Sequence, residues 1–296
     1  MKIACEAALL RRALMATPMP PKKLMMPDIH FVTALPCEAQ PLIEFYRLKP
    51  AGRSKSFEIY EAPGKHLVLS GVGKIRAAEA VRFLHEFAGK IRDQAWLNVG
   101  IGGHPDLKIG EGVLAHKITD QKLAKSWYPP LVFEAPSRTE SVVTVERAEN
   151  KYGESCVYEM EASGFYEAAC RFSTAELIHC YKIISDNRES STKKVSAALV
   201  ERLVRQNLEM IDEIVKKILT LAQALPHAEI PAHEFQKFLE RWHFTVTEQH
   251  QLRRLLLRLQ TLEPEAEIWP ELQLLTKSKD VLNTLKDRIN SLPVAL

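Results

Sequence analysis

VYEMEASGFYEAA (Val157–Ala169) sets two glutamates, Glu159 and Glu161, where a short apolar strand runs into a helix. An isolated Glu-Met-Glu triplet is commonly a charged strand end whose second glutamate opens a helix, because the helix dipole favours negative charge there. A further strand, HCYKIIS (His179–Ser185), is followed directly by Asp186. An aspartate after a buried strand is often a helix cap or a turn residue. Each motif alone is therefore weak, and their meaning depends on the rest of the chain.

Strands and helices alternate on both sides of this stretch. Short apolar, β-rich runs predict strands at residues 30–35, 57–62, 66–71, 95–103, 112–119 and 141–146. Helical periodicity predicts helices at residues 74–87, 162–172 and 195–222. The alternation predicts an α/β fold, a three-layer αβα sandwich around a central mixed sheet. Ligands of such sheets bind beyond the carboxyl ends of the strands, where we expect Glu38, residues 100–103, residues 159–161 and Asp186.

The chain divides into three parts. Residues 1–27 are predicted to be a disordered N-terminal extension, because their charges and apolar residues lack the order of a secretory signal. Residues 28–225 form the α/β domain. Residues 226–296 begin with a proline-containing linker and continue as a small helical module, with an apolar stripe at Leu252, Leu255, Leu256 and Leu259. A module this small has a thin core, so we expect the helical tail either to dock on its own domain or to bind a protein partner.

Composition excludes several classes of function. The net charge of +3 and the mixing of basic with acidic residues argue against nucleic-acid binding. The sequence has no apolar run of membrane-spanning length, so no membrane association is expected. The five cysteines lack CxxC spacing and fit the reduced thiols of a cytoplasmic protein. Since no histidine pairs with them at ligand spacing, we predict no metal site, and no cofactor is expected.

Taken in order, five stretches resemble the purine nucleoside phosphorylase/uridine phosphorylase superfamily. The resemblance is closest to its methylthioadenosine/S-adenosylhomocysteine nucleosidase branch. The stretches are TALPCEAQPL, SGVGKIRAAEAVRFL, NVGIGGHPDLKIGEGVLAHKITD, YEMEASGFYEAA and KIISDN, and they span most of residues 28–225. The resemblance implies cleavage of the N-glycosidic bond of a purine nucleoside, with adenine as the expected base. It also implies a homodimer.

Cleavage of this bond needs a proton donor for the leaving base, a group that holds the ribose and a placed nucleophile. The resemblance implies that Asp186 is the acid facing the purine N7 and that Glu161 binds the ribose hydroxyls. Met160 resembles the methionine that packs against the sugar. Glu159 occupies the first acidic position of the same motif. Glu38 resembles the glutamate that positions the attacking water.

Other positions agree less well with the superfamily. Gly102 and Gly103 fall in the glycine turn near base and sugar, but Ile101 stands where many nucleosidases have a serine. The region that normally recognises the base is short. It offers Trp127 as a residue that stacks on the base, with an ordinary loop anchor as the alternative.

The nucleophile is predicted from charge. The GDPxR-like phosphate loop of the phosphorylases is missing, and TALPCEAQ, which carries Glu38, stands in its place. A carboxylate there repels phosphate and suits a neutral water. We therefore expect a hydrolytic nucleosidase. The alternatives are a phosphorylase of the same fold and a catalytically weak nucleoside-binding or regulatory module that acts with a partner protein.

Overall fold

A computed structural model describes residues 27–53, 56–149, 151–225, 230, 232–263 and 266–292. The predicted N-terminal extension therefore lies, except for Pro27, outside the described residues. The chain separates into two compact units, with the boundary between Ala224 and Leu225.

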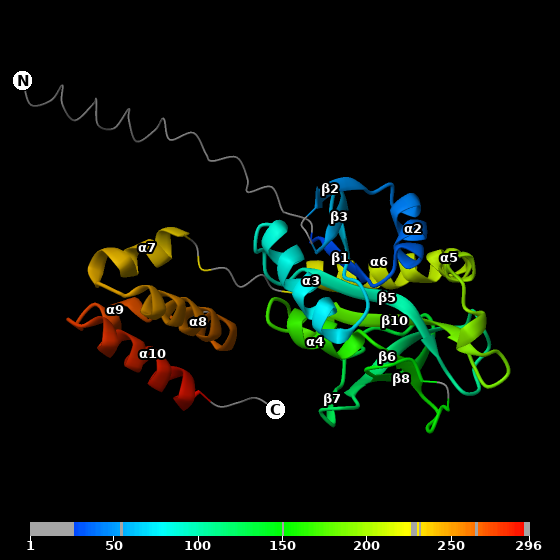
Figure 1. Cartoon of the computed structure of the whole chain (residues 1–296). Helices are drawn as coiled ribbons and strands as arrows, with labels where there is room; N and C mark the ends of the chain where they lie inside the picture. The colour runs from blue at the N-terminus through cyan, green and yellow to red at the C-terminus, as the bar shows by residue number, and fades with distance from the viewer. Residues whose placement is uncertain are drawn as a thin grey trace, which may run out of the picture. The chain divides into compact units, whose positions relative to one another are not determined.

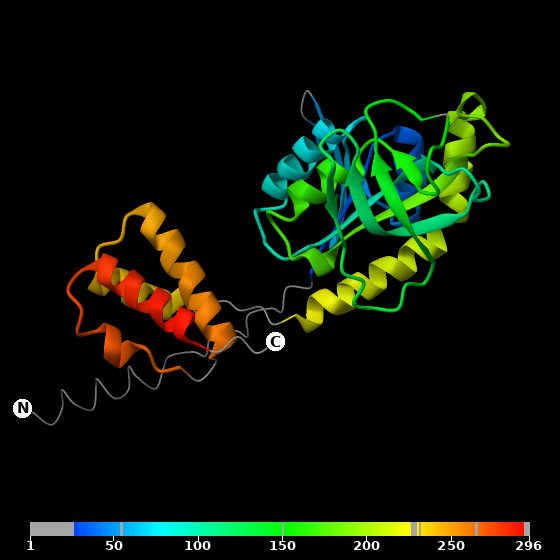
Figure 2. The same ribbon diagram turned by 90° about the horizontal axis from the view of Figure 1, so that it is seen from below.

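The first unit is a mixed α/β structure. Its strands are β1 (Ile29–Thr33), β2 (Lys49–Arg53), β3 (Glu58–Ala62), β4 (Lys65–Leu69), β5 (Ala95–Gly103), β6 (Gly112–Asp120), β7 (Lys125–Trp127), β8 (Arg138–Thr144), β9 (Val157–Glu159) and β10 (Ile178–Asp186). Its helices are α2 (Pro36–Phe45), α3 (Lys74–Phe87), α4 (Ala162–Ala169), α5 (Ala197–Gln206) and α6 (Leu208–Ala224), with 3₁₀ turns η1 (Ala175–Leu177) and η2 (Thr192–Lys194). Helix α3 packs on α4, and α2 packs on α5 and α6 (Figures 1 and 2).

The central sheet is mixed, as the sequence predicts. Strand β5 lies between β1 and β10 and runs parallel to both, whereas β2, β3 and β4 form an antiparallel edge. Strand β10 also pairs with β6, so β5, β10, β6, β8 and β9 close into a ring. The expected flat three-layer sandwich is therefore not confirmed, because part of the sheet is a closed barrel. Irregularities between Ile184 and Asp186 and between Ala115 and Lys117 interrupt the register, and such bulges bend strands toward closure.

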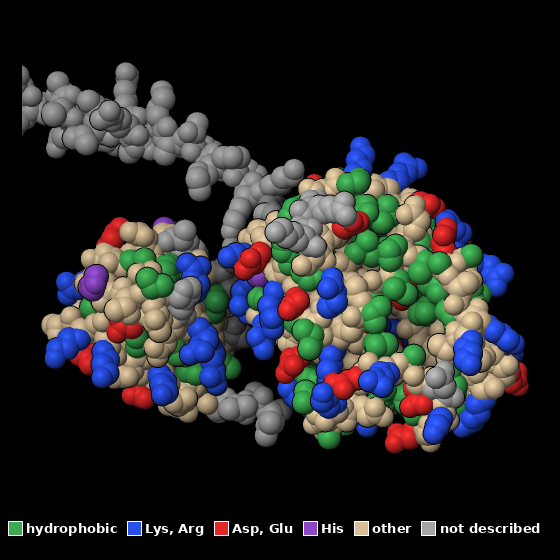
Figure 3. All heavy atoms as spheres, in the orientation of Figure 1, with side chains coloured by type: hydrophobic (Ala, Val, Ile, Leu, Met, Phe, Trp, Pro, Cys, Tyr) green, Lys and Arg blue, Asp and Glu red, His purple; other side chains and the backbone are tan. Residues whose placement is uncertain are grey.

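The buried core around β5 and β10 fixes the positions of their ends. Every residue of β10 is buried, and β5 is buried except at Ile101. Apolar side chains of α3 and α4 cover these strands in one continuous core. Figure 3 shows basic and acidic side chains interspersed over the visible surface of the described chain, which agrees with the mixed charge pattern of the sequence.

The second unit contains α7 (Ala232–Arg241), α8 (Val246–Leu262), α9 (Trp269–Leu272) and α10 (Ser278–Ser291). Helix α8 begins with a capping box, in which Thr245 and Glu248 each bond the backbone N–H of the other. The stripe at Leu252, Leu255, Leu256 and Leu259 is buried in a core that this unit forms by itself. The stripe is therefore not an exposed docking surface.

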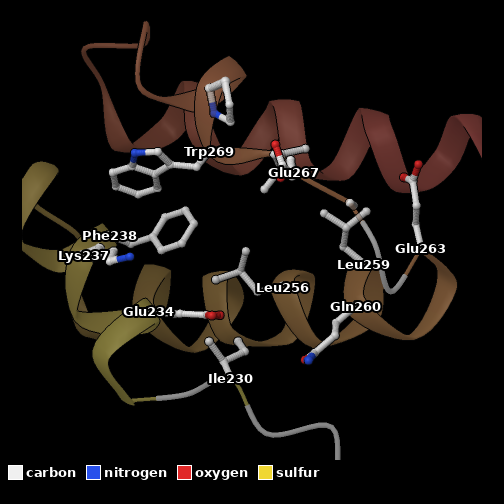
Figure 4. Close-up of a pocket in the computed structure, with 13 residues that line it drawn as sticks. Ile230, Glu234, Lys237, Phe238, Leu256, Leu259, Gln260, Glu263, Glu267 and Trp269 are labelled. Carbon is white, nitrogen blue, oxygen red and sulfur yellow. The ribbon is translucent and has the colours of Figure 1, made fainter.

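This helical unit also has a hollow of about 530 Å³ beside α7 and α8 (Figure 4). Phe238, Leu256 and Trp269 line it, together with three glutamates, of which Glu263 is bound by Arg288. Within the described ranges, no helix is long and apolar enough to cross a membrane, and no cluster of His, Cys, Asp or Glu suits a metal ion.

Candidate active site

A hollow of about 150 Å³ lies at the ends of β1, β5, β9 and β10 and at the beginnings of α2 and α4. Parallel neighbours β1, β5 and β10 end at the same edge of the sheet, so residues far apart in sequence meet there. Seven of the eight predicted site residues line this hollow: Glu38, Gly102, Gly103, Glu159, Met160, Glu161 and Asp186.

Glu38 is fixed by three backbone amides. Its Oε2 accepts hydrogen bonds from the N–H groups of Ala34 and Leu35, both at 2.9 Å, and its Oε1 accepts one from Ile101 at 3.0 Å. Burial raises the pKa of Glu38, and the nearby Lys182 ammonium opposes that shift. Ile101 thus contributes its amide to the site, although it lacks the hydroxyl of a serine. Gly100 leaves the necessary room, since a Cβ there would lie 3.0 Å from Oε1 of Glu38.

Glu159 and Lys182 form a buried ion pair beneath the hollow, with 2.8 Å between Oε2 and Nζ. The Oε2 atom of Glu159 also accepts the N–H groups of Glu161 and Ala162 at the start of α4, and its Oε1 accepts the Thr144 hydroxyl at 2.6 Å. The side chain of Glu159 is 0% exposed. These contacts give Glu159 a positioning role at the start of α4, and its predicted substrate contact stays a prediction.

Glu161 is the less constrained of the two glutamates. Its Oε1 accepts the backbone N–H of Gly73 at 2.7 Å, and Gly73 has a φ of 107°, which favours glycine. Burial and the neighbouring charge of Glu159 raise the pKa of Glu161 to about 7. Met160, half-buried beside it, lines the same hollow.

The raised pKa of Glu161 predicts how stability depends on pH. Between the ordinary value of 4.5 and about 7, the folded protein keeps a proton on Glu161 that the unfolded chain has lost. The associated stabilisation is fully present below pH 4.5 and disappears as pH rises through 7. Relative to Glu161→Gln, we expect the wild-type free energy of unfolding to fall by at most about 3 kcal/mol over this window. Urea denaturation of both proteins from pH 4.5 to 8 measures this difference, and parallel curves would contradict it.

Asp186 is surrounded by hydroxyl donors. Ser185 donates to Oδ1 at 2.5 Å, Thr192 donates to Oδ2 at 2.9 Å, and Tyr152 also donates to Oδ2. Burial and the contact with Asp186 raise the pKa of the Tyr152 hydroxyl, which keeps it protonated as a donor. Gly103 permits this packing, because a Cβ there would lie 2.6 Å from Oδ2 of Asp186.

Trp127 is the predicted site residue that does not line the hollow. It ends β7, a short strand that pairs back on β6 with Trp127 opposite Ile118. Its side chain packs against the main core, and the Lys125 ammonium lies 4.6 Å from its ring centroid. This position agrees with the loop-anchor alternative, and the stacking role of Trp127 stays a prediction from the sequence. Tyr158 is an aromatic residue that does line the hollow.

Sequence reasoning missed three residues of this site, Lys182, Tyr152 and Thr192. Lys182 had a usable signal, because a lysine in an apolar, fully buried strand needs an acidic partner. Tyr152 and Thr192 had none, since each lies outside the regular strands and its contact with Asp186 depends on how the chain returns to the site.

Several solved structures share this fold. A 5′-methylthioadenosine nucleosidase from Arabidopsis thaliana matches with a TM-score of 0.54 and 14% identity, over 65% of this chain and 96% of that one. The 5′-methylthioadenosine/S-adenosylhomocysteine nucleosidase of Neisseria meningitidis, bound to methylthio-immucillin-A, matches with a TM-score of 0.54 and 18% identity, over 65% and 100%. The futalosine hydrolase of Helicobacter pylori matches with a TM-score of 0.50 and 13% identity, over 65% and 99%.

No protein-family model and no curated protein matches the sequence. The structural neighbours belong to the nucleoside phosphorylase/nucleosidase superfamily. At these identities the likeness defines the fold, so the α/β unit has the fold of that superfamily, as the sequence motifs predict.

Proposed function

We propose that the α/β unit hydrolyses the N-glycosidic bond of a purine nucleoside, with adenine as the expected base. The observation that carries this proposal is the meeting of Glu38, Glu161 and Asp186, from three distant parts of the chain, at one hollow. Structural neighbours named as nucleosidases and as a futalosine hydrolase support it.

Each carboxyl group has a task that fits its surroundings. Asp186 assists departure of the base at N7 through its carboxyl group. Glu161, ionised when substrate is bound, accepts the ribose hydroxyls and strengthens those bonds as the sugar becomes cationic. Glu38, held by three amides, keeps a fixed position from which it orients water and takes its proton.

Hydrolysis is favoured over phosphorolysis by the charge near Glu38. Phosphate is an anion that proteins meet with arginine and backbone donors. The amides of Ala34, Leu35 and Ile101 are already taken by Glu38, whose carboxylate would repel phosphate. A phosphorylase is therefore the second candidate. A nucleoside-binding module without turnover is the third, since Ile101 removes a hydroxyl expected near the water.

The deciding experiment is base release measured by liquid chromatography with and without phosphate. The substrates are methylthioadenosine, S-adenosylhomocysteine, 5′-deoxyadenosine, adenosine and inosine. We expect adenine release without phosphate, with the free sugar as the second product. A ribose 1-phosphate product or a requirement for phosphate would assign a phosphorylase, and binding without base release would assign the third candidate.

Glu161→Gln tests the sugar contact. Glutamine keeps the shape of the side chain but not the charge that stabilises the developing cation. We expect turnover to fall by about 10²-fold or more. The matched control is Glu167→Gln on the same helix, where Glu167 forms an exposed ion pair with Lys125, and it should retain wild-type turnover. Unchanged kinetics in Glu161→Gln would remove this residue from the site.

We also propose that residues 226–296 are a separate helical module, since their core contains residues of this unit alone. Urea unfolding of that segment expressed alone tests the idea, because a segment without a cooperative transition would be part of the larger unit. The homodimer and the protein partner stay predictions from the sequence.

A further inference from the structure

The hydroxyl of Tyr152 donates to Oδ2 of Asp186, the residue to which the proposed function assigns the leaving base. Oδ2 of Asp186 accepts both Tyr152 and Thr192. A carboxylate oxygen has two lone pairs for strong hydrogen bonds, so these two donors use both of them. A base that approaches Oδ2 must therefore displace one of the two hydroxyls.

The hollow is also smaller than the pockets that usually hold small ligands. It measures about 150 Å³, whereas binding pockets for small ligands usually measure about 300–1,000 Å³. The Tyr152 side chain lies beside Asp186 and is only 4% exposed. A Cβ on Gly103 would lie 2.8 Å from its hydroxyl oxygen, so the phenol is pressed against the end of β5.

The segment that carries Tyr152 packs outside the main core. Tyr152 belongs to a small apolar cluster with Val145, Cys156 and Tyr158, distinct from the main core. Its neighbours Lys151 and Gly153 are exposed. Tyr152 also has a φ of 46°, an unfavourable conformation for a residue other than glycine. Moving this side chain therefore disturbs little of the fold.

We propose that Tyr152 controls access of the base to Asp186. In the free protein its hydroxyl is bonded to Asp186, which lines the hollow, and the base of the nucleoside displaces this hydroxyl on binding. This inference rests on the proposed function, because it takes Asp186 as the residue that meets the base. The hydrogen bond between Tyr152 and Asp186 is broken when the nucleoside binds. This bond therefore weakens substrate affinity and has no effect on the bound complex.

Two variants test the proposal in the full chain. Tyr152→Phe removes the hydroxyl alone, and Tyr152→Ala removes the ring as well. The matched control is Tyr181→Phe, since the buried Tyr181 hydroxyl donates to Asn207 and is not a partner of Asp186. A side-chain hydrogen bond corresponds to a factor of about ten in an equilibrium.

We expect Tyr152→Phe to lower KM for methylthioadenosine and the Kd for adenine about tenfold, with kcat unchanged. Tyr152→Ala should lower both further, and Tyr181→Phe should lower neither. A KM or Kd that is unchanged or higher in Tyr152→Phe would overturn the proposal, since a residue with a merely structural role would not tighten binding when removed.

A separate measurement distinguishes failure of this inference from failure of the proposed function. Hydrogen exchange of residues 151–156 should be faster in Tyr152→Phe than in wild type, whether or not any nucleoside is cleaved. Faster exchange together with tighter adenine binding but no base release would keep the role of Tyr152 and reject hydrolysis. Equal exchange in the two proteins would reject the role of Tyr152 even if hydrolysis is observed.

Discussion

Asp186→Asn should lower the rate of base release by about 10³-fold, within the range of about 10²–10⁴ that proton transfer by a positioned side chain contributes. Asparagine keeps the size of the side chain and an oxygen that Ser185, Thr192 or Tyr152 can donate to. It has no carboxyl proton to share with N7 of the base. Because the loss concerns the transition state, kcat should fall while KM changes little.

Chromatographic base release gives both constants, and titration with adenine measures whether the site still binds a base. The control is Asp106→Asn, whose carboxylate lies at the exposed ion pair with Arg188, and its kinetics should match those of wild type. If Asp186→Asn retained more than about a tenth of the wild-type kcat, a factor below that range, Asp186 would not be the acid.

Lys182→Met should destabilise the fold by about 3–5 kcal/mol, the usual loss when one partner of a buried ion pair is removed. The variant leaves the carboxylate of Glu159 inside the protein without its cation, and the ammonium that opposes the raised pKa of Glu38 is also lost. Because Glu159 accepts hydrogen bonds from the N–H groups at the start of α4, Glu161 should also shift from its position in the site.

Urea denaturation at pH 7.5 measures the loss, and two further variants define its cause. Lys182→Met combined with Glu159→Gln should recover part of the stability, because the second change removes the unpaired charge. Lys125→Met, which breaks an exposed pair with Glu167, should cost about 1 kcal/mol or less. Equal losses of unfolding free energy for Lys182→Met and Lys125→Met would show that the buried pair contributes no more to stability than the exposed pair.

The stability and chemistry of this site therefore depend on the same strand. β10 carries Lys182, which neutralises the glutamate under the hollow, and Asp186, which lies in it. The ammonium of Lys182 pairs with Glu159 on β9 and acts electrostatically on Glu38 and Glu161, so carboxyl groups converge here without every charge being left unpaired.

The sequence by itself determined most of the strands and the edge of the sheet at which the candidate site lies, but it predicted one helix over residues 195–222 where the structure has α5 and α6. Apolar runs predict strands because burial follows local composition, and acidic residues after those runs predict a site because parallel strands share their carboxyl ends. Glu38, Glu161 and Asp186 could therefore be assigned to one hollow from motif order alone.

The tertiary structure determined the contacts between separate elements, which the local sequence pattern does not encode. Closure of the barrel depends on β10 pairing with both β5 and β6, and Trp127 is turned away by the register of β7 on β6. The contact of Tyr152 with Asp186 joins residues 34 positions apart, and that of Glu38 with Ile101 joins residues 63 apart. Periodicity reports only the environment of each residue along its own element, whereas these contacts depend on the register and packing of several elements at once.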